Sequence, residues 1–435
     1  MRTKINSLFV VLYLVGTLSH YAQTISPAHP QEKPLALLGG TAHIGNGKVI
    51  ENCVIVIDKG KIVQIGSIGE LSIDLAGYES VRTDGKHIYP GLISPLSGLG
   101  LSEIGSVRAT VDAGETGSLN PNVRSIIAYN TDSEVIPTLR SNGILLAQIT
   151  PRGGLISGTS SIVQLDGWNW EDAAVQTDNG IHLNWPGMFR RRGYGSSRTT
   201  TPDPNYKKNV EILDKFFTDS RTYFESENRV KVNLKLEAMK GLFDGSKRLF
   251  ISAGYVKEIV ESIQIAKKHG VQKIILVGGD EDAWMVKDFL KENNIPVIVA
   301  HIHRMAKRKD EDVRLPFKLP SMFMKEGILT GIYYSRATGS MNLPFVAGHA
   351  AGYGLTREEA LQCITLNNAQ ILGIEDQYGT LETGKDATLI VSSGDILDIR
   401  TNNVELAYIS GRRISLDNKH KQLYRKYKEK YEGQK

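Results

Sequence analysis

The pair His301 and His303 is the group of residues whose type and spacing most directly suggest chemistry. Both histidines end the apolar run IPVIVAHIH, which predicts a buried strand. A spacing of two places both imidazoles on one face of a strand, and imidazole nitrogens are common zinc ligands. The simpler interpretation is two polar residues where a strand leaves the core, because spacing identifies no acidic partner. We favour that interpretation and keep a metal site formed by these two histidines as the alternative.

The other residues that could do chemistry have no recognisable partners in the sequence. Tyr255 and Glu103 are candidates for lining a pocket, but no spacing assigns a base and a nucleophile. Asp280 begins the acidic run DED at the start of a predicted helix, where carboxylates favour the helix dipole. The two cysteines, Cys53 and Cys363, exclude a disulfide framework and a cysteine-rich zinc module.

The positive charge of the chain is concentrated in its tail. The net charge of the 435 residues is +5, and the segment from Arg412 to Lys435 holds nine Lys and Arg against three Asp and Glu, or +6. The rest therefore sums to −1, which argues against nucleic acid as a partner. In the basic tail, residues 416–435, Leu423, Tyr424, Tyr427 and Tyr431 recur at helical spacing. We expect this stripe to pack against the sheet domain; adhesion to an anionic membrane or an acidic partner is the alternative.

Residues 1–23 have the pattern of an export signal. Arg2 and Lys4 precede an apolar run from Leu8 to Leu18 that is too short to span a bilayer. The pattern predicts a signal peptide and a periplasmic or secreted protein, with an N-terminal anchor as the alternative. No later segment reads as a transmembrane helix.

The remaining chain reads as β-rich at both ends and α/β between them. Short glycine-broken strands fill Leu35 to Gly66 and return over 387–391 and 404–410. Helical periodicity over 256–269 alternates with buried strands, which favours βαβ units around a parallel sheet. We predict a (β/α)8 TIM barrel over residues 90–375, roughly 285 residues, and a composite β-sandwich domain from 35–89 plus 376–415.

Three segments resemble the amidohydrolase superfamily, specifically its imidazolonepropionase-like branch. They are HIYPGLI from His87, GLTREEAL from Gly354 running on to TLNNAQILG, and GTLETGKDATLIV from Gly379. In the second, Asn368 and Gln370 stand where proline and lysine are usual. A glycine-rich stretch around Arg152 and Ser157 resembles a family loop near the pocket.

The resemblance implies one or two divalent metals at the strand ends, held by a His-x-His pair, single histidines and an aspartate. In this chain the corresponding positions hold residues that bind transition metals poorly, namely Leu96, Gly98, Ser252, Gly278 and Ser335. We therefore predict no metal cofactor. The residues expected to line the pocket are Ser94, Ser97, Ser252, Tyr255, Asp280, His301, His303 and Ser335.

The class of activity that the resemblance implies is hydrolysis of non-peptide carbon–nitrogen bonds. Because the metal ligands are substituted, two hypotheses remain open: an enzyme with a relocated or metal-free site, and a catalytically inactive homologue that acts as a binding or partner subunit. The expected ligand is a small amide. The expected assembly is a homo-oligomer or a hetero-oligomer with an active homologue.

Overall fold

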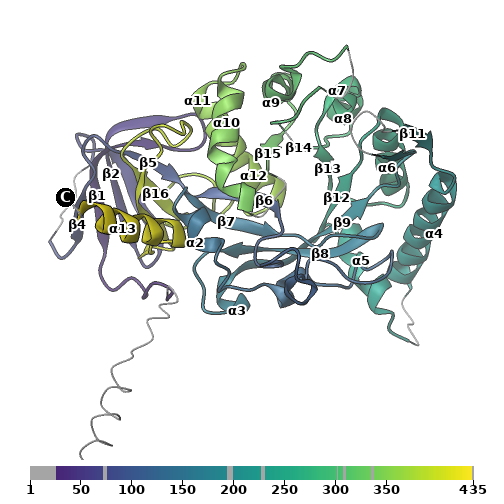
Figure 1. Cartoon of the computed structure of the whole chain (residues 1–435), viewed down its shortest axis with the longest axis horizontal. Helices are drawn as coiled ribbons and strands as arrows, with labels where there is room; N and C mark the ends of the chain where they lie inside the picture. Colours follow the sequence, from purple (N-terminus) through teal and green to yellow (C-terminus); the bar gives the residue numbers. More distant parts are fainter. Residues whose placement is uncertain are drawn as a thin grey trace, which may run out of the picture.

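The computed structural model describes residues 26–71, 76–193, 199–226, 231–300, 302–306, 310–334 and 338–433. The predicted signal peptide, His301 and Ser335 lie outside the described residues. Two bodies lie side by side in Figure 1, a smaller sheet domain and a larger barrel. Within the described residues, no helix is long and apolar enough to cross a membrane.

The sheet domain is built from both ends of the chain. Its strands are β1 (Leu35–His43), β2 (Val49–Asp58), β3 (Lys61–Ser67), β4 (Glu79–Arg82), β5 (His87–Pro90), β16 (Leu389–Ser392), β17 (Val404–Ile409) and β18 (Arg412–Arg413). They run in the order β18-β17-β16-β5-β1-β2-β3, with β4 beside β1. The antiparallel pairing of β16 with β5 joins the two chain ends into one sheet.

The barrel sheet also has eight strands, and the predicted α/β fold class is confirmed. In sheet order they are β15 (Thr330–Ile332), β14 (Val297–Val299), β13 (Ile274–Gly278), β12 (Arg248–Ser252), β9 (Ala174–Asn184), β8 (Ile156–Gln164), β7 (Ile144–Ile149) and β6 (Leu92–Ser97). Isoleucine and phenylalanine side chains such as Ile93, Ile162 and Phe250 fill the interior. The barrel is therefore a packed core whose open end lies at the carboxyl ends of the strands.

One strand departs from the regular repeat, because β8 pairs antiparallel with both β7 and β9. The connection from β7 to β8 spans only residues 150–155, and a parallel crossover needs about a dozen residues. Gly153 and Gly154 take positive φ values of 93° and 65° in this connection. The chain therefore turns back on itself.

Helices surround the barrel and connect it to the sheet domain (Figure 1). They are α2 (Ile136–Arg140), α3 (Trp170–Ala173), α4 (Tyr206–Glu225), α5 (Leu234–Phe243), α6 (Val256–Lys268), α7 (Glu281–Met285), α8 (Lys287–Glu292), α9 (Leu315–Lys325), α10 (Leu343–Ala351), α11 (Arg357–Cys363), α12 (Leu366–Leu372) and α13 (Lys419–Glu432). A small hairpin of β10 (Phe189–Arg192) and β11 (Thr199–Pro202) precedes α4.

The predicted helix over 256–269 corresponds to α6. Its apolar residues Ile259, Ile263 and Ala266 are buried at spacings of four and three, which is the core-facing stripe of an amphipathic helix. Gly270 follows the helix with a φ of 81°, the left-handed conformation that ends helices.

Helix α12 closes the gap between the first and last strands of the barrel sheet. The Asn368 amide donates hydrogen bonds to the Ile93 carbonyl on β6 and to the Ile332 carbonyl on β15, at 3.0 and 3.1 Å. Gly331 makes room for this bridge, since a Cβ there would collide with the Asn368 side-chain oxygen. The asparagine that replaces the family's usual proline thus connects two strand edges.

Candidate functional site

The carboxyl end of β6 presents no ligand atom at the two positions where the family carries its His-x-His pair. Leu96 is 8% exposed and belongs to the apolar barrel interior. Its φ of 54° is unusual for a leucine, and its N–H donates to Gln148 Oε1 at 3.1 Å. Gly98, two residues on, has no side chain. An imidazole pair therefore has no counterpart at this strand end.

An arginine lies against the second of these positions. A Cβ added at Gly98 would lie 3.4 Å from Arg152 Nη2 and 3.6 Å from Arg152 Cζ. A side chain longer than Cβ at position 98 would therefore compete with the guanidinium for space. The Arg152 charge also reaches Tyr333, where burial raises the pKa of the phenol and the nearby guanidinium opposes the rise.

The loop that carries Arg152 is held at several points. The Arg152 N–H donates to the Ala113 carbonyl at 2.6 Å. The side-chain amide of Asn184, at the end of β9, donates to the Gly154 carbonyl at 3.0 Å and to Ser157 Oγ at 2.9 Å. The glycine-rich stretch expected near the pocket thus lies at the barrel mouth. The sequence offered no partner for Arg152, since Gly98 and Ala113 come close only in the fold.

The serines of the predicted pocket differ in their surroundings. Ser94 is fully buried, and its hydroxyl has no hydrogen-bond partner within the described residues. Ser97 is buried and accepts a hydrogen bond from the Leu99 N–H at 3.2 Å. Ser252 is half-buried at the end of β12, and its carbonyl accepts from the Trp185 N–H at 2.9 Å. These contacts position the strand ends.

Tyr255 and Asp280 both precede helices. Tyr255 caps α6, and its ring meets Phe189 edge-on at 5.2 Å. Asp280 occupies the cap position of α7, close to Gly278 at the end of β13. A Cβ at Gly278 would contact the Ala253 carbonyl at 3.4 Å, so β12 and β13 approach closely at this edge.

His303 pairs with a histidine from another element. Its Nε2 lies 2.9 Å from Nδ1 of His349 on α10, and the two rings meet edge-on at 4.6 Å. Burial, and then the charge of His349, lower the pKa of His303. The proximity of His349 to His303 had no signal in the sequence, because the two residues are 46 positions apart.

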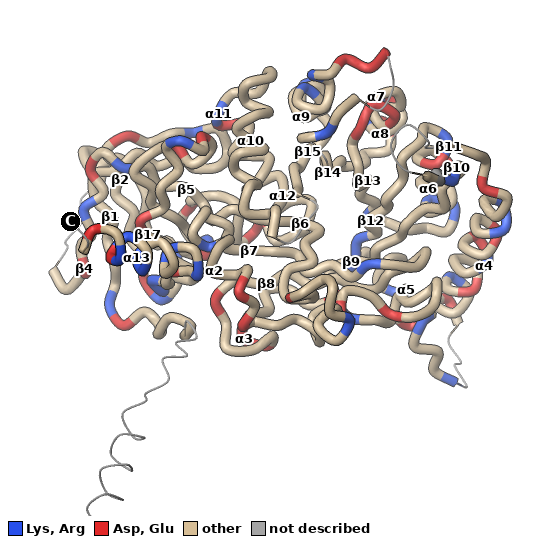
Figure 2. Tube along the Cα trace, in the orientation of Figure 1, with Lys and Arg blue, Asp and Glu red and all other residues tan. Residues whose placement is uncertain are grey.

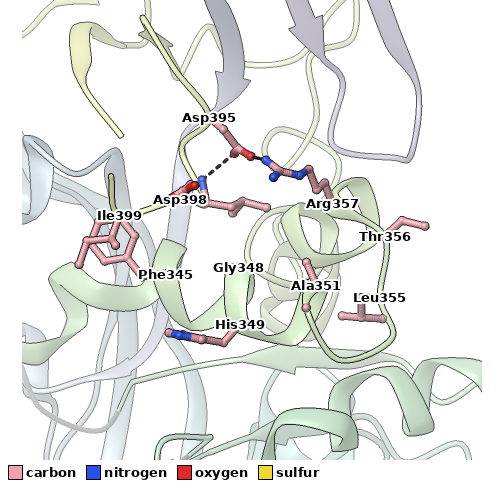
Figure 3. A pocket seen from close by; sticks show the side chains of 12 residues that line it. Phe345, Gly348, His349, Ala351, Leu355, Thr356, Arg357, Asp395, Asp398 and Ile399 are labelled. Carbon is pink, nitrogen blue, oxygen red and sulfur yellow. Dashed lines mark hydrogen bonds and ion pairs between the residues drawn. The ribbon is translucent and has the colours of Figure 1, made fainter. Parts of the chain in front are cut away.

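His349 also lines a concave surface outside the barrel mouth. This cavity, of about 580 Å³, lies between α10, α11 and the segment 395–399. Figure 3 shows Phe345 and Ile399 at one side and the ion pair of Arg357 with Asp395 at the other. Its volume falls in the range of small-molecule pockets.

The divalent metal that the resemblance implies does not fit the described ligand positions. Leucine and glycine offer no side-chain donor at 96, 98 and 278, and the Arg152 guanidinium would repel a cation beside Gly98. Within the parts of the chain that the structure describes, no three His, Cys, Asp or Glu side chains are grouped to hold a metal ion. The prediction of no metal cofactor remains a prediction.

The barrel, together with a sheet domain from both chain ends, is the type of fold that the resemblance to amidohydrolases implies. Comparison with known proteins agrees. The model of the amidohydrolase family matches residues 231–414, so the predicted resemblance to the amidohydrolase superfamily is confirmed over this part of the chain.

Solved structures share the fold. An amidohydrolase from Thermotoga maritima MSB8 is 23% identical with a TM-score of 0.76, covering 88% of this chain and 99% of its own. A prolidase complexed with N-methylphosphonate-L-proline is 17% identical with a TM-score of 0.54, covering 88% and 99%. Ochratoxinase from A. niger is 16% identical with a TM-score of 0.51, covering 88% and 95%. No protein with a curated description matches this sequence.

Proposed function

We propose that this chain is an exported amidohydrolase-superfamily protein whose barrel mouth binds a small amide ligand that carries an anionic group. The observation that supports the proposal is the Arg152 guanidinium beside Gly98, where the superfamily usually places a metal ligand. A guanidinium presents paired N–H donors that match the two oxygens of a carboxylate. On this proposal, a fixed cation of the protein replaces the metal as the positive group of the site.

Ligand binding without metal-activated hydrolysis is the role that the described strand ends favour. A metal would supply a water of lowered pKa and a polarised carbonyl. Leu96, Gly98 and Gly278 supply neither a metal ligand nor a general base. The chain would then act as a binding subunit, alone or beside an active homologue.

Hydrolysis of non-peptide carbon–nitrogen bonds is the second candidate function. The match to the amidohydrolase family model favours it, and so does the His303–His349 pair, which brings two imidazoles together at the carboxyl side of β14. Such a pair could serve a relocated metal or a general base.

The first experiment measures binding of N-acetyl amino acids and of their neutral methylamides to the mature protein by calorimetry. We expect the carboxylates to bind and Arg152→Gln to weaken that binding about tenfold to a hundredfold, since a hydrogen bond to a charged group contributes about 1.5–3 kcal/mol. Arg152→Lys tests whether charge alone suffices. Arg82→Gln, which removes an exposed arginine from the sheet domain, is the matched control. Equal binding of acids and methylamides would contradict the proposal.

The second experiment decides between the two functions. Zinc, manganese and iron are quantified in the purified protein, which is also assayed against cyclic amides and dipeptides. Metal near one equivalent together with turnover, both lost in His303→Ala, would establish the hydrolase. Binding of the carboxylates without turnover, with or without metal, supports the binding role.

A further inference from the structure

Helix α13 is attached to the body of the protein at its first turn. Asn418 caps the helix, since its side chain accepts from the Lys421 N–H at 2.9 Å, and its amide donates to Ser141 Oγ, just after α2, at 2.8 Å. Lys419 and Gln422 line the hollow beside α2. These contacts fix which side of the helix faces the protein.

The aromatic stripe of the helix faces away from the body. Every residue from Lys419 to Glu432 is exposed except the half-buried Gln422. Tyr424, Tyr427 and Tyr431 are 66%, 50% and 61% exposed. The prediction that the stripe packs against the sheet domain is therefore wrong, because α13 approaches the body through its polar side.

Basic side chains flank the stripe on both sides. At 100° per residue, Lys430 falls along one border of the tyrosines and Lys421 and Lys428 along the other, whereas Lys419 and Lys426 fall further round the helix, toward Gln422. Glu429 falls on the opposite face. Figure 2 shows the basic residues gathered on α13. Six Lys and Arg against two Glu give this helix a net charge of +4, whereas the chain before Arg412 is nearly neutral.

We propose that α13 binds the surface of an anionic lipid bilayer. A helix with aromatic residues along one stripe and lysines on both borders can lie in the plane of the interface, with the lysines reaching the headgroups. Pairing with α13 of a second copy is opposed by the like charges. A stable protein interface buries about 800 Å² on each partner, more than one flat tyrosine stripe provides.

The test is sedimentation of the mature full-length protein with vesicles of phosphatidylcholine alone or mixed with phosphatidylglycerol. We expect binding only to the mixed vesicles, weakening as salt rises because the charges are screened. Lys421→Gln with Lys428→Gln and Lys430→Gln should reduce binding about a hundredfold, from roughly fivefold for each lysine. The exposed lysines Lys207, Lys208 and Lys235 of α4 and α5 provide a control triple variant with the same loss of charge.

A second variant separates the tyrosines from the charge. Tyr424→Ser with Tyr427→Ser and Tyr431→Ser should also weaken binding, and the fold should survive because no residue of α13 is buried. Binding that is equal on both vesicles, or equally reduced by the control triple variant, would overturn the proposal. Absence of binding to either vesicle would overturn it as well and would favour an acidic protein as the partner.

Discussion

His182 is an ionisable residue enclosed in the barrel. It is 6% exposed, and its ring stacks on Phe250 with the centroids 4.7 Å apart and the planes 5° apart. Its Nε2 has no hydrogen-bond partner within the described residues. Burial lowers the pKa of this imidazole to about 3, because a charged ring would lose its hydration without gaining a counter-ion.

This residue should make the protein sensitive to mild acid. An unfolded histidine has a pKa near 6.5, so between about pH 6.5 and 3 the unfolded chain binds the extra proton. Stability should therefore fall with decreasing pH through this window, by up to about 1.4 kcal/mol per pH unit. His182→Leu should reduce the loss between pH 7 and pH 5, as measured by urea unfolding. Part of the dependence of stability on pH should remain in this variant, because burial also lowers the pKa of His87.

The control for this prediction is His420→Gln, which removes an exposed histidine from α13. If His182→Leu and His420→Gln show the same pH dependence as the parent protein, the buried imidazole is not the source of the acid sensitivity. Sequence reasoning did not single out His182, because a histidine within a strand shows no sign of which face it occupies until the register of β9 with β12 is known.

At the scale of the element, α12 should contribute more to the stability of the barrel than its length of seven residues suggests. Asn368→Asp keeps the size of the side chain but removes the amide that donates to β6 and β15, leaving two buried carbonyls near a carboxylate. We expect a loss of about 2–4 kcal/mol in the free energy of unfolding, from roughly 1–3 kcal/mol for each unsatisfied buried group. Gln370→Ala changes an exposed amide on the same helix and is the matched control.

An unchanged urea midpoint for Asn368→Asp would show that other contacts of α12 close the barrel without this bridge. Hydrogen exchange of the Thr330–Ile332 strand gives a local readout. Exchange should rise in Asn368→Asp and stay as in the parent protein in Gln370→Ala.

The sequence predicted those helices whose own residues show a helical periodicity or a capping pattern. The periodicity over 256–269 matches the buried face of α6, and Thr356 and Glu359 form a capping box at the start of α11 from their own residue types. The antiparallel β8 was not predicted, because its direction is set by the length of a turn and not by its apolar content. The site was only partly predictable: the substituted ligand positions can be located from strand motifs in the sequence, but the Arg152 contact with Gly98 depends on tertiary structure.

At the scale of the whole molecule, Asp166 joins segments far apart in the chain. It is 3% exposed, and its carboxylate accepts from Arg140 Nη1 at 2.6 Å, from Arg412 Nη1 at 3.1 Å and from the Ala28 N–H at 3.0 Å. These partners come from α2 of the barrel, from β18 of the sheet domain and from the segment before β1. The carboxylate thus connects both bodies, and a single residue, Gly91, lies between β5 and β6.

We therefore expect the two bodies to unfold together. The contacts of Asp166 should raise the urea midpoint of this common transition. Asp166→Asn leaves Arg140 buried without a counter-charge and should cost about 3–5 kcal/mol. All four tryptophans, Trp168, Trp170, Trp185 and Trp284, lie in the barrel, so their fluorescence reports barrel unfolding while circular dichroism reports the whole chain. Both urea transitions should coincide in the parent protein and shift together in Asp166→Asn. Asp84→Asn, which breaks an exposed pair, should shift them little. A dichroism transition that precedes the fluorescence change would show instead that the sheet domain unfolds independently.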